Sequence, residues 1–310
     1  MKKIIATRDA YGSALMDLGH ENKDIVVLDA DLSGSTKTGI FAKEFPDRFF
    51  NVGIAEQNLM GTAAGLAAVG KIPFTSTFAV FATGRAYEII RNSICYPNLN
   101  VKIAATHAGL TVGEDGATHQ ALEDLSLMRS LPNMTVLNPA DAEETKQAIK
   151  ASAEHIGPVY IRLGRSGVPT LFDEDYKFEI GKGVELVDGT DITIIATGIM
   201  VGEALKAANE LNKEGISARI INISTIKPID KDIIIKAAKE TKGIITAEEH
   251  NIIGGLGSAV AEVVVENAPT KMKRIGTMDV FGESGTGTEL LRKYNLTCET
   301  IVKEAKDLLK

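Results

Sequence analysis

The sequence predicts an α/β fold with two doubly wound domains. Two observations predict this fold: short β-branched runs alternate with helix-length segments through both halves of the chain, and 310 residues are enough for two domains of ordinary size. Residues 163–189 separate the halves, with two early glycines, Pro169 and an acidic patch that are typical of a connection. We therefore expect domains over residues 1–165 and 191–310, joined by a connector over residues 166–190.

The first domain is expected to hold a mainly parallel sheet that is covered on both faces. Its first helix has Thr7 or Asp9 as a possible cap, and its first strand is a β-branched run that ends in the polar loop 29–35. In chain order we expect a helix over 7–22, a strand over 25–28, a helix beginning near Glu56, a strand over 72–77, a helix over 86–95, a strand over 101–105, a helix over 121–130, a strand over 134–137, a helix over 140–154 and a strand over 159–162.

The second domain continues the same alternation. In chain order we expect a strand over 192–196, a helix over 201–213, a strand over 218–223, a helix over 231–240, a strand over 243–247 and a helix over 259–266. The glycine-rich stretch 251–258 is interpreted as a structural turn, because glycine turns are common. Glu248-Glu249-His250 is interpreted as a solvated strand end, because a metal site needs side chains that converge from one face.

Composition excludes several classes of protein. The chain is 44% hydrophobic and 24% charged, which indicates a soluble globular protein, and its net charge of −7 argues against a nucleic-acid role. No stretch approaches the ~18 apolar residues of a membrane span, and the start is too short in apolar residues for a secretory signal. The two cysteines, Cys95 and Cys298, cannot form a disulfide framework, so we expect a reducing, cytoplasmic setting.

Three stretches carry possible chemistry. Glu56 opens a helix that is otherwise small and apolar, and from pattern alone a helix-capping glutamate is favoured over a functional one. Phe78 and Phe81 share one face of a helical turn, for which core packing is the favoured interpretation. Loop 106–120 carries glycines, acids and two histidines, and a flexible solvated loop or a proton-transfer site are equally compatible with it.

Two motifs point further. The segment Gly-Ile-Ala-Glu-Gln-Asn (53–58), and Thr-His (106–107) followed by Gly-Glu-Asp-Gly-Ala-Thr-His-Gln (113–120), together resemble the thiamine-diphosphate enzymes of the transketolase family. The resemblance implies a pyrimidine-binding domain followed by a transketolase C-terminal domain. It also implies that Glu56 hydrogen-bonds ring nitrogen N1′ of the cofactor and so helps to activate the thiazolium carbon C2.

The resemblance assigns roles to further residues. His107 and His119 are implied to be catalytic and to contact sugar hydroxyls, while Asp115 recognises the configuration of the 2-hydroxyl group. The other implied contacts are Phe78 and Phe81 stacking on the aminopyrimidine, Asp31 and Leu32 on the thiazolium side, and Arg8, Ser35 and Arg162 at the sugar phosphate. One position departs from the family, because Gly84 stands where transketolases commonly carry a tyrosine; Arg85 is the candidate to fill that space.

A missing motif predicts a partner. The family binds its diphosphate through a divalent metal held by a Gly-Asp-Gly segment, and no Gly-Asp-Gly occurs in these 310 residues. The resemblance thus implies the C-terminal subunit of a split transketolase of the pentose phosphate pathway. It would share thiamine diphosphate with an N-terminal subunit that holds Mg²⁺, as a heterotetramer in which this chain also self-associates.

Alternative functions remain open from the sequence. The beta subunit of a 2-oxoacid dehydrogenase carries a similar Ala-Glu-Gln stretch, and His107 together with His119 favours transketolase over it. The enzyme 1-deoxyxylulose-5-phosphate synthase shares much of the histidine loop, and His107 favours transketolase over it. A non-catalytic assembly protein is a further alternative. The retained Glu56, His107, Asp115 and His119 argue against it.

Overall fold

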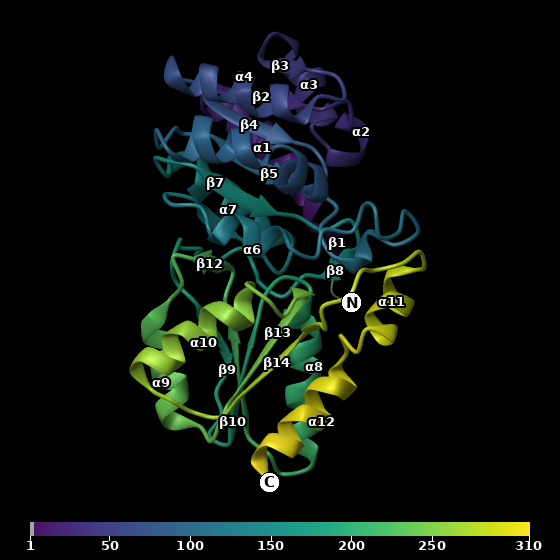
Figure 1. Cartoon of the computed structure of the whole chain (residues 1–310), viewed down its shortest axis with the longest axis vertical. Helices are drawn as coiled ribbons and strands as arrows, with labels where there is room; N and C mark the ends of the chain where they lie inside the picture. Colours follow the sequence, from purple (N-terminus) through teal and green to yellow (C-terminus); the bar gives the residue numbers. More distant parts are fainter. Residues whose placement is uncertain (1–2) are drawn as a thin grey trace.

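A computed structural model describes residues 3–310 and places the two halves of the chain one above the other (Figure 1). The first half lies at the top in purple and blue, and the second lies below in green and yellow. Each half is built on one mainly parallel sheet with helices packed on it, so the predicted fold class is confirmed. No helix between residues 3 and 310 combines the length and apolar character that crossing a membrane requires.

The first sheet has seven strands in the order β12-β6-β7-β5-β4-β2-β3. The pairing of β12 with β6 is antiparallel, and the other pairings in this sheet are parallel. Its strands are β2 Ile25–Asp29, β3 Phe49–Asn51, β4 Ile72–Ser76, β5 Lys102–Ala105, β6 Thr135–Leu137, β7 Val159–Arg162 and β12 Thr225–Lys227. The helices around it are α1 Thr7–Glu21, α2 Ser33–Thr36, α3 Gly39–Glu44, α4 Glu56–Ala68, α5 Tyr87–Ile89, α6 Asp124–Arg129 and α7 Ala142–Glu154.

The second sheet has five strands in the order β14-β13-β10-β11-β9, with β9 antiparallel to β11. Its strands are β9 Val184–Val187, β10 Ile192–Ala196, β11 Ala218–Asn222, β13 Ile244–Asn251 and β14 Met272–Thr277. Its helices are α8 Met200–Lys213, α9 Lys231–Glu240, α10 Leu256–Asn267, α11 Gly287–Lys293 and α12 Cys298–Leu309. The elements from β14 onward were not predicted from the sequence.

Several predicted elements differ in detail. The connector holds two strands: β8 Gly167–Pro169 pairs with β1 Ile4–Ala6, and β9 forms the edge of the second sheet. The helix expected over 86–95 is mostly π-helical, because π turns over Phe81–Arg85 and Ile90–Cys95 flank the short α5. The helix expected over 121–130 begins only at Asp124, because the backbone of Ala121 pairs with the preceding loop.

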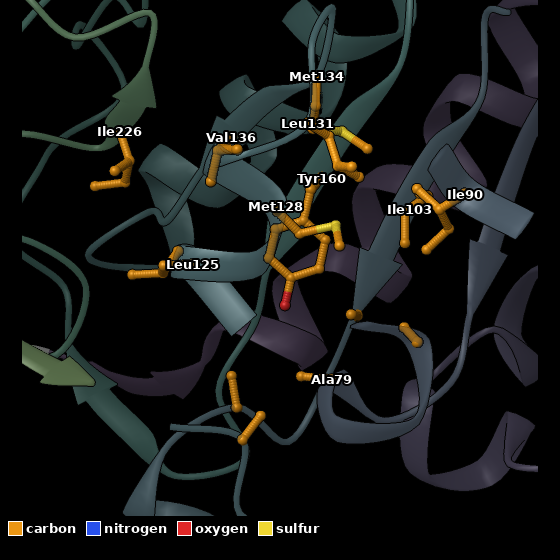
Figure 2. Packing of buried hydrophobic residues seen from close by; sticks show 14 of the residues in the cluster. Ala79, Ile90, Ile103, Leu125, Met128, Leu131, Met134, Val136, Tyr160 and Ile226 are labelled. Carbon is orange, nitrogen blue, oxygen red and sulfur yellow. The ribbon is translucent and has the colours of Figure 1, made fainter. Parts of the chain in front are cut away.

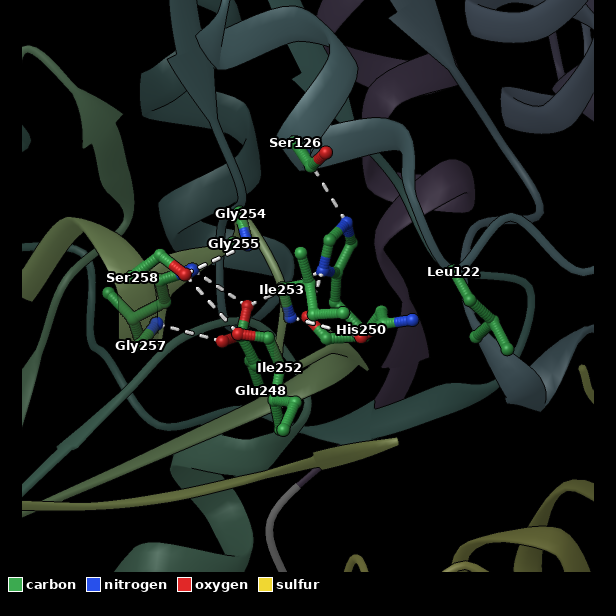
Figure 3. A network of polar contacts seen from close by, with 12 residues as sticks. Leu122, Ser126, Glu248, His250, Ile252, Ile253, Gly254, Gly255, Gly257 and Ser258 are labelled. Atoms are coloured by element: carbon green, nitrogen blue, oxygen red, sulfur yellow. Dashed lines mark hydrogen bonds and ion pairs between the residues drawn. The ribbon is translucent and has the colours of Figure 1, made fainter. Parts of the chain in front are cut away.

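The interpretation of Glu248-Glu249-His250 as a solvated strand end is wrong. These residues extend β13, and their side chains are 0%, 4% and 0% exposed. The first half of the chain contacts two of them: the Ser126 amide donates to His250 Nε2 at 3.4 Å (Figure 3), and the Thr111 amide donates to Glu249 Oε1 at 2.6 Å. Buried polar groups of this kind require internal partners, and those of Glu249 and His250 join the two halves.

The largest core cluster also joins the two halves. It contains α4 and β7 residues from the first half together with Ile226 of β12 and Leu256 of α10. Figure 2 shows Tyr160 among these side chains, with Met128 beside its ring and Leu125 and Val136 nearby. Because β12 comes from the second half of the chain but pairs with β6 of the first sheet, burial of its apolar residues fixes one half against the other.

Candidate active site

The candidate site lies where parallel strands of the first sheet end. β2, β4, β5 and β7 run in the same direction, so the loops that follow them leave one edge of the sheet, which is where open α/β sheets bind ligands. The loops after β4 and β5 are joined directly: Phe78 forms a bridge with Thr106, and the Ala79 amide donates to the Thr106 carbonyl at 2.7 Å. This pairing places Phe78 next to the histidine loop 106–120.

His107 stacks on Phe78 with their ring centroids 3.8 Å apart. Arg8 Nη1 lies 3.0 Å from His107 Nε2, and Thr106 Oγ1 lies 2.9 Å from His107 Nδ1. A guanidinium can only donate, so Nε2 must be the acceptor and Nδ1 must carry the proton. Burial, together with the nearby charges of Arg8 and Arg165, lowers the pKa of His107 to about 3.

His107 is therefore expected to stay neutral, with its proton on Nδ1, from pH 5 to pH 8. The unfolded chain takes up a proton near pH 6.5 while the folded chain does not, so this histidine weakens folding as the pH falls from 6.5 toward 3. The measurement is the side-chain ¹⁵N spectrum of histidine-labelled protein, with the signal assigned from a His107→Asn variant. A ring that titrates between pH 5 and pH 8 would contradict the neutral state, and a proton on Nε2 would contradict the tautomer.

The second histidine faces the same aromatic pair. Phe78 and Phe81 are stacked at 5.9 Å, and the His119 ring stands edge-on to them at 6.2 and 5.4 Å. Thr118 Oγ1 lies 2.9 Å from His119 Nδ1. The sequence alone favours core packing for the two phenylalanines; in the structure both rings contact His119, and Phe78 also stacks on His107.

Glu56 opens α4 and is only 2% exposed. Both of its carboxylate oxygens lie 2.9 Å from Arg85 Nη1, and the Arg85 guanidinium also lies 4.7 Å from the centre of the Phe81 ring. Arg85 thereby links the carboxylate to the aromatic pair. Gly84, at the position of the family tyrosine, lies in the π turn with open space around it.

The loop after β2 is fixed by an aspartate that the sequence reading did not single out. Buried Asp29 accepts hydrogen bonds from the Leu32 amide at 2.6 Å and from the Thr36 and Thr38 hydroxyls at 2.6 and 2.8 Å. Burial raises the pKa of this carboxyl group. The network holds the predicted Leu32, and Asp31 beside it adopts a φ of 64°.

Two residues outside this loop contact it: Asn51, and Arg8, which is one of the predicted site residues. Asn51 Nδ2 donates to Asp31 Oδ1 at 2.8 Å. Ser35 contacts Arg8 through its backbone carbonyl, which accepts from Arg8 Nη1 at 3.0 Å. Arg8 therefore connects the loop after β2 with His107.

Arg162 is buried away from this site, which contradicts its expected contact with a sugar phosphate. Its side chain is 4% exposed, and its Nε donates to Asp124 Oδ2 at 2.7 Å. Its Nη2 donates to the Ala121 and Glu249 carbonyls at 3.3 and 2.9 Å. Burial opposes ionisation of Asp124, but Arg162 outweighs it and lowers the pKa of that carboxyl group. The charge of Arg162 is therefore neutralised by an internal ion pair with Asp124.

Arg165 borders the site but was not singled out from the sequence. Its side chain is 35% exposed, with Nη1 3.3 Å from Glu114 Oε2 and 3.6 Å from Asp115 Oδ2. Its Nη1 also donates to the Val112 carbonyl, so the guanidinium lies against the histidine loop. The signal was its position: Arg162 is the last residue of a buried strand, whereas Arg165 follows in the loop at the strand's carboxyl end.

A cofactor could be held only in part by these residues. A buried carboxylate and an aromatic face suit a flat nitrogen heterocycle, since the carboxylate can bond a ring nitrogen and the phenylalanines can stack. Within residues 3–310, no three His, Cys, Asp or Glu side chains converge in a way that could hold a metal ion.

Comparison with known proteins matches both halves of the chain. Residues 3–170 match the family model "Transketolase, pyrimidine binding domain", and residues 181–301 match "Transketolase, C-terminal domain". A solved structure described as a split gene transketolase, inactive beta4 tetramer, is 61% identical, with a TM-score of 0.93 over 98% of both chains.

Curated relatives give the same picture. A protein of Methanocaldococcus jannaschii described as a transketolase C-terminal section is 56% identical, over 98% of this chain and 96% of its own length. The 6-deoxy-6-sulfo-D-fructose transketolase subunit of a Clostridium strain is 43% identical, over 97% of this chain and 94% of its own. By contrast, the chain spans 49% of the length of the mammalian transketolases it matches.

Proposed function

This chain belongs to the transketolase family, and we propose that it acts as the C-terminal subunit of a thiamine-diphosphate-dependent transketolase. The enzyme would transfer a two-carbon ketol unit between phosphorylated sugars of the pentose phosphate pathway. The observation that carries this proposal is the joint position of Glu56, the Phe78–Phe81 pair, His107 and His119 at one edge of the first sheet.

The residues present fit the aminopyrimidine ring of thiamine diphosphate. Glu56 would hold ring nitrogen N1′, and Phe78 and Phe81 would stack on the ring, with Asp31 and Leu32 on the thiazolium side. When bound, the cofactor supplies the carbon nucleophile and electron sink for ketol transfer. His107 and His119 would bind the sugar hydroxyls and move their protons, and Asp115 would recognise the 2-hydroxyl group.

The neutral state of His107 suits this role. With Nδ1–H donating to Thr106, its Nε2 lone pair points to Arg8, so a sugar hydroxyl that enters can replace the guanidinium as donor. Arg8 is then free to bind an anionic group of the same sugar. The two residues would act as one unit that exchanges an internal hydrogen bond for contacts with substrate.

The phosphate site we propose uses Arg8, Arg165 and Ser35. Arginine pairs with a phosphate through two parallel N–H donors, and a nearby hydroxyl can add a further bond. Arg165 replaces Arg162 in this assignment because it is partly exposed and lies beside Glu114 and Asp115 of the histidine loop. One relative is described as acting on a sulfo-sugar, whose anionic group is a sulfonate and not a phosphate. The mutation below therefore compares donors with and without a phosphate.

Arg165→Ala is expected to raise KM for a phosphorylated ketose donor about 10- to 100-fold, because a hydrogen bond to a charged group contributes about 1.5–3 kcal/mol. KM for the same ketose without its phosphate should change little, which separates lost charge recognition from a displaced loop. Arg292→Ala, at an exposed position of α11, is the matched control. Equal changes with both donors would contradict phosphate recognition by Arg165.

We also propose an N-terminal partner subunit. It would carry the Gly-Asp-Gly segment that holds Mg²⁺ and the diphosphate, and the two chains would form a heterotetramer in the cytoplasm. Two facts support a partner: the chain spans about half of the mammalian transketolases it matches, and its 310 residues contain no Gly-Asp-Gly. The tetramer described for the 61% identical protein supports self-association of this chain.

The test is to purify the protein gently from its own cells and to identify any chain that copurifies. The preparation is assayed for thiamine-diphosphate-dependent release of glyceraldehyde 3-phosphate from xylulose 5-phosphate and an aldose acceptor. Activity with a partner that carries Gly-Asp-Gly supports the proposal. Consumption of pyruvate instead would favour the 2-oxoacid dehydrogenase or deoxyxylulose phosphate synthase class.

A further inference from the structure

The second half of the chain contacts the loop that carries both histidines at several points. Its middle forms a 3₁₀ turn over Leu110–Val112, against which α11 packs (Figure 1). Gln120 Nε2 donates to the Leu110 carbonyl at 3.1 Å and to the Glu283 carbonyl at 2.9 Å. Gly116 lies so close to Ser284 that an added Cβ would come within 2.6 Å of its Oγ. The sugar-binding loop thus rests on residues of the second domain that follow it in the chain by more than a hundred positions.

The strongest of these contacts comes from Glu249 of β13. Its Oε1 accepts the Thr111 amide at 2.6 Å, and its side chain is buried. The carboxylate also lies against Gly109, where an added Cβ would come within 2.3 Å of Glu249 Cδ. Gly109 has a φ of 83°, so this position favours glycine twice over, for its conformation and for its closeness to the carboxylate.

A short stretch of backbone connects the position of Glu249 with the predicted catalytic side chains. Gly109 is two residues from His107, whose own backbone is in the left-handed region with a φ of 59°. The Ala108 amide donates to the Leu163 carbonyl, and the Gly109 amide donates to the Ala121 carbonyl, so the ends of the loop are tied to the first half of the chain. Its middle is held by Arg165 and Ser166, which donate to the Val112 and Thr111 carbonyls, and by Glu249 of the second half, which accepts the Thr111 amide.

We infer that Glu249 is a positioning residue for ketol transfer. It acts through Thr111 and Gly109 to hold the loop in the shape that presents His107, Asp115 and His119 to the sugar. The second domain then has a part in substrate binding as well as in packing. This inference deepens the proposed function and rests on it for its kinetic consequences. The effect of Glu249 on the order of the loop can be measured without any activity.

Glu248 provides a matched control. It is the preceding residue of β13 and is equally buried, and its oxygens accept the Leu256 and Gly257 amides at 2.7 and 2.8 Å (Figure 3). These bonds close the start of α10 inside the second domain. Removing the Glu248 carboxylate therefore removes two backbone hydrogen bonds from the same strand without removing one from the histidine loop.

The experiment compares wild type with Glu249→Ala, Glu249→Asp, Glu249→Gln and Glu248→Ala. Hydrogen exchange of loop 107–120 is measured on the chain alone. KM for the ketose donor, kcat and thiamine-diphosphate affinity are measured on the enzyme assembled with its partner. Circular dichroism and thermal melting identify any variant that does not fold; Asp keeps the charge but is too short to reach the Thr111 amide, so it serves if the alanine variant fails.

We expect loop exchange to be about tenfold faster or more in the Ala and Asp variants, since loss of a hydrogen bond to a charged group frees the local structure. The donor KM should rise by a similar factor while cofactor affinity stays near that of wild type. Glutamine, whose side-chain oxygen can still accept from Thr111, should restore most of both. Glu248→Ala should lower the melting temperature but leave loop exchange and KM unchanged.

Two results would overturn the inference. One is unchanged loop exchange in both Glu249→Ala and Glu249→Asp; the other is an equal change in Glu248→Ala, which would make the effect one of general stability. An inactive wild-type assembly would instead count against the proposed function, and the exchange measurement would still decide whether Glu249 holds the loop.

Discussion

Glu56→Gln is expected to remove most turnover and leave the fold intact. Glutamine has nearly the same shape but cannot exchange a proton with a ring nitrogen of the cofactor as a carboxylate can, so kcat should fall about 10²- to 10⁴-fold, the usual range for a lost acid–base group. The measurement is kcat of the assembled enzyme at saturating cofactor and sugars, with the melting temperature of the chain alone recorded beside it.

Two further variants separate the possible reasons for a loss at Glu56. Arg85→Ala keeps the carboxylate but removes the guanidinium that both of its oxygens contact, so it isolates the effect of the ion pair. Glu44→Gln changes a half-exposed glutamate of α3 and controls for the charge alone. An unchanged kcat in Glu56→Gln would contradict the cofactor-activation role. Equal losses in Glu56→Gln and Arg85→Ala would show that the pair acts as a unit.

The predicted residues that lie together in the structure share a simple physical origin. Parallel strands must end at one edge, so residues just after β2, β4 and β5 had to be neighbours once the alternation of strands and helices was read correctly. That argument brings Asp31, Phe78 and His107 to the same edge from sequence alone. Stacking of Phe78 on His107 then follows from their equivalent places after neighbouring strands.

The predictions that were wrong depended on contacts between the two halves of the chain. Taken alone, Glu248-Glu249-His250 is three polar residues for which solvent is expected, but all three are buried, and Thr111 and Ser126 of the first half bond Glu249 and His250. Strand β12 crosses to the first sheet for a similar reason, since its apolar residues are buried there. Local periodicity cannot show which distant segment will bury a strand.

The error at Arg162 has the same cause and leads to a testable difference. Two arginines three residues apart, at positions 162 and 165, are equally plausible partners for a phosphate when only composition and spacing are considered. Their surroundings differ: position 162 is the end of a buried strand facing Asp124, whereas position 165 is partly exposed. A mutation should therefore lower stability at the first position and substrate affinity at the second.

Arg162→Ala is expected to destabilise the chain by about 3–5 kcal/mol, because it leaves the Asp124 carboxylate buried without its counter-charge. Tyr160 would remain as a hydrogen-bond donor to Asp124 at 2.7 Å, which is too little to replace an ion pair. The measurement is urea unfolding of the isolated chain. Unfolding is monitored with a probe in each domain, because Arg162 also donates to the Glu249 carbonyl of the second half.

The double variant Asp124→Leu with Arg162→Met tests the cause of that loss. If the cost of Arg162→Ala is an uncompensated buried charge, removing both charges should recover much of the stability, since buried ion pairs are often replaceable by apolar side chains of similar size. Lost packing predicts no such recovery. Should Arg162→Ala keep wild-type stability and raise KM only for phosphorylated donors, the guanidinium must reach the substrate after all, and the buried ion pair could not be its main state.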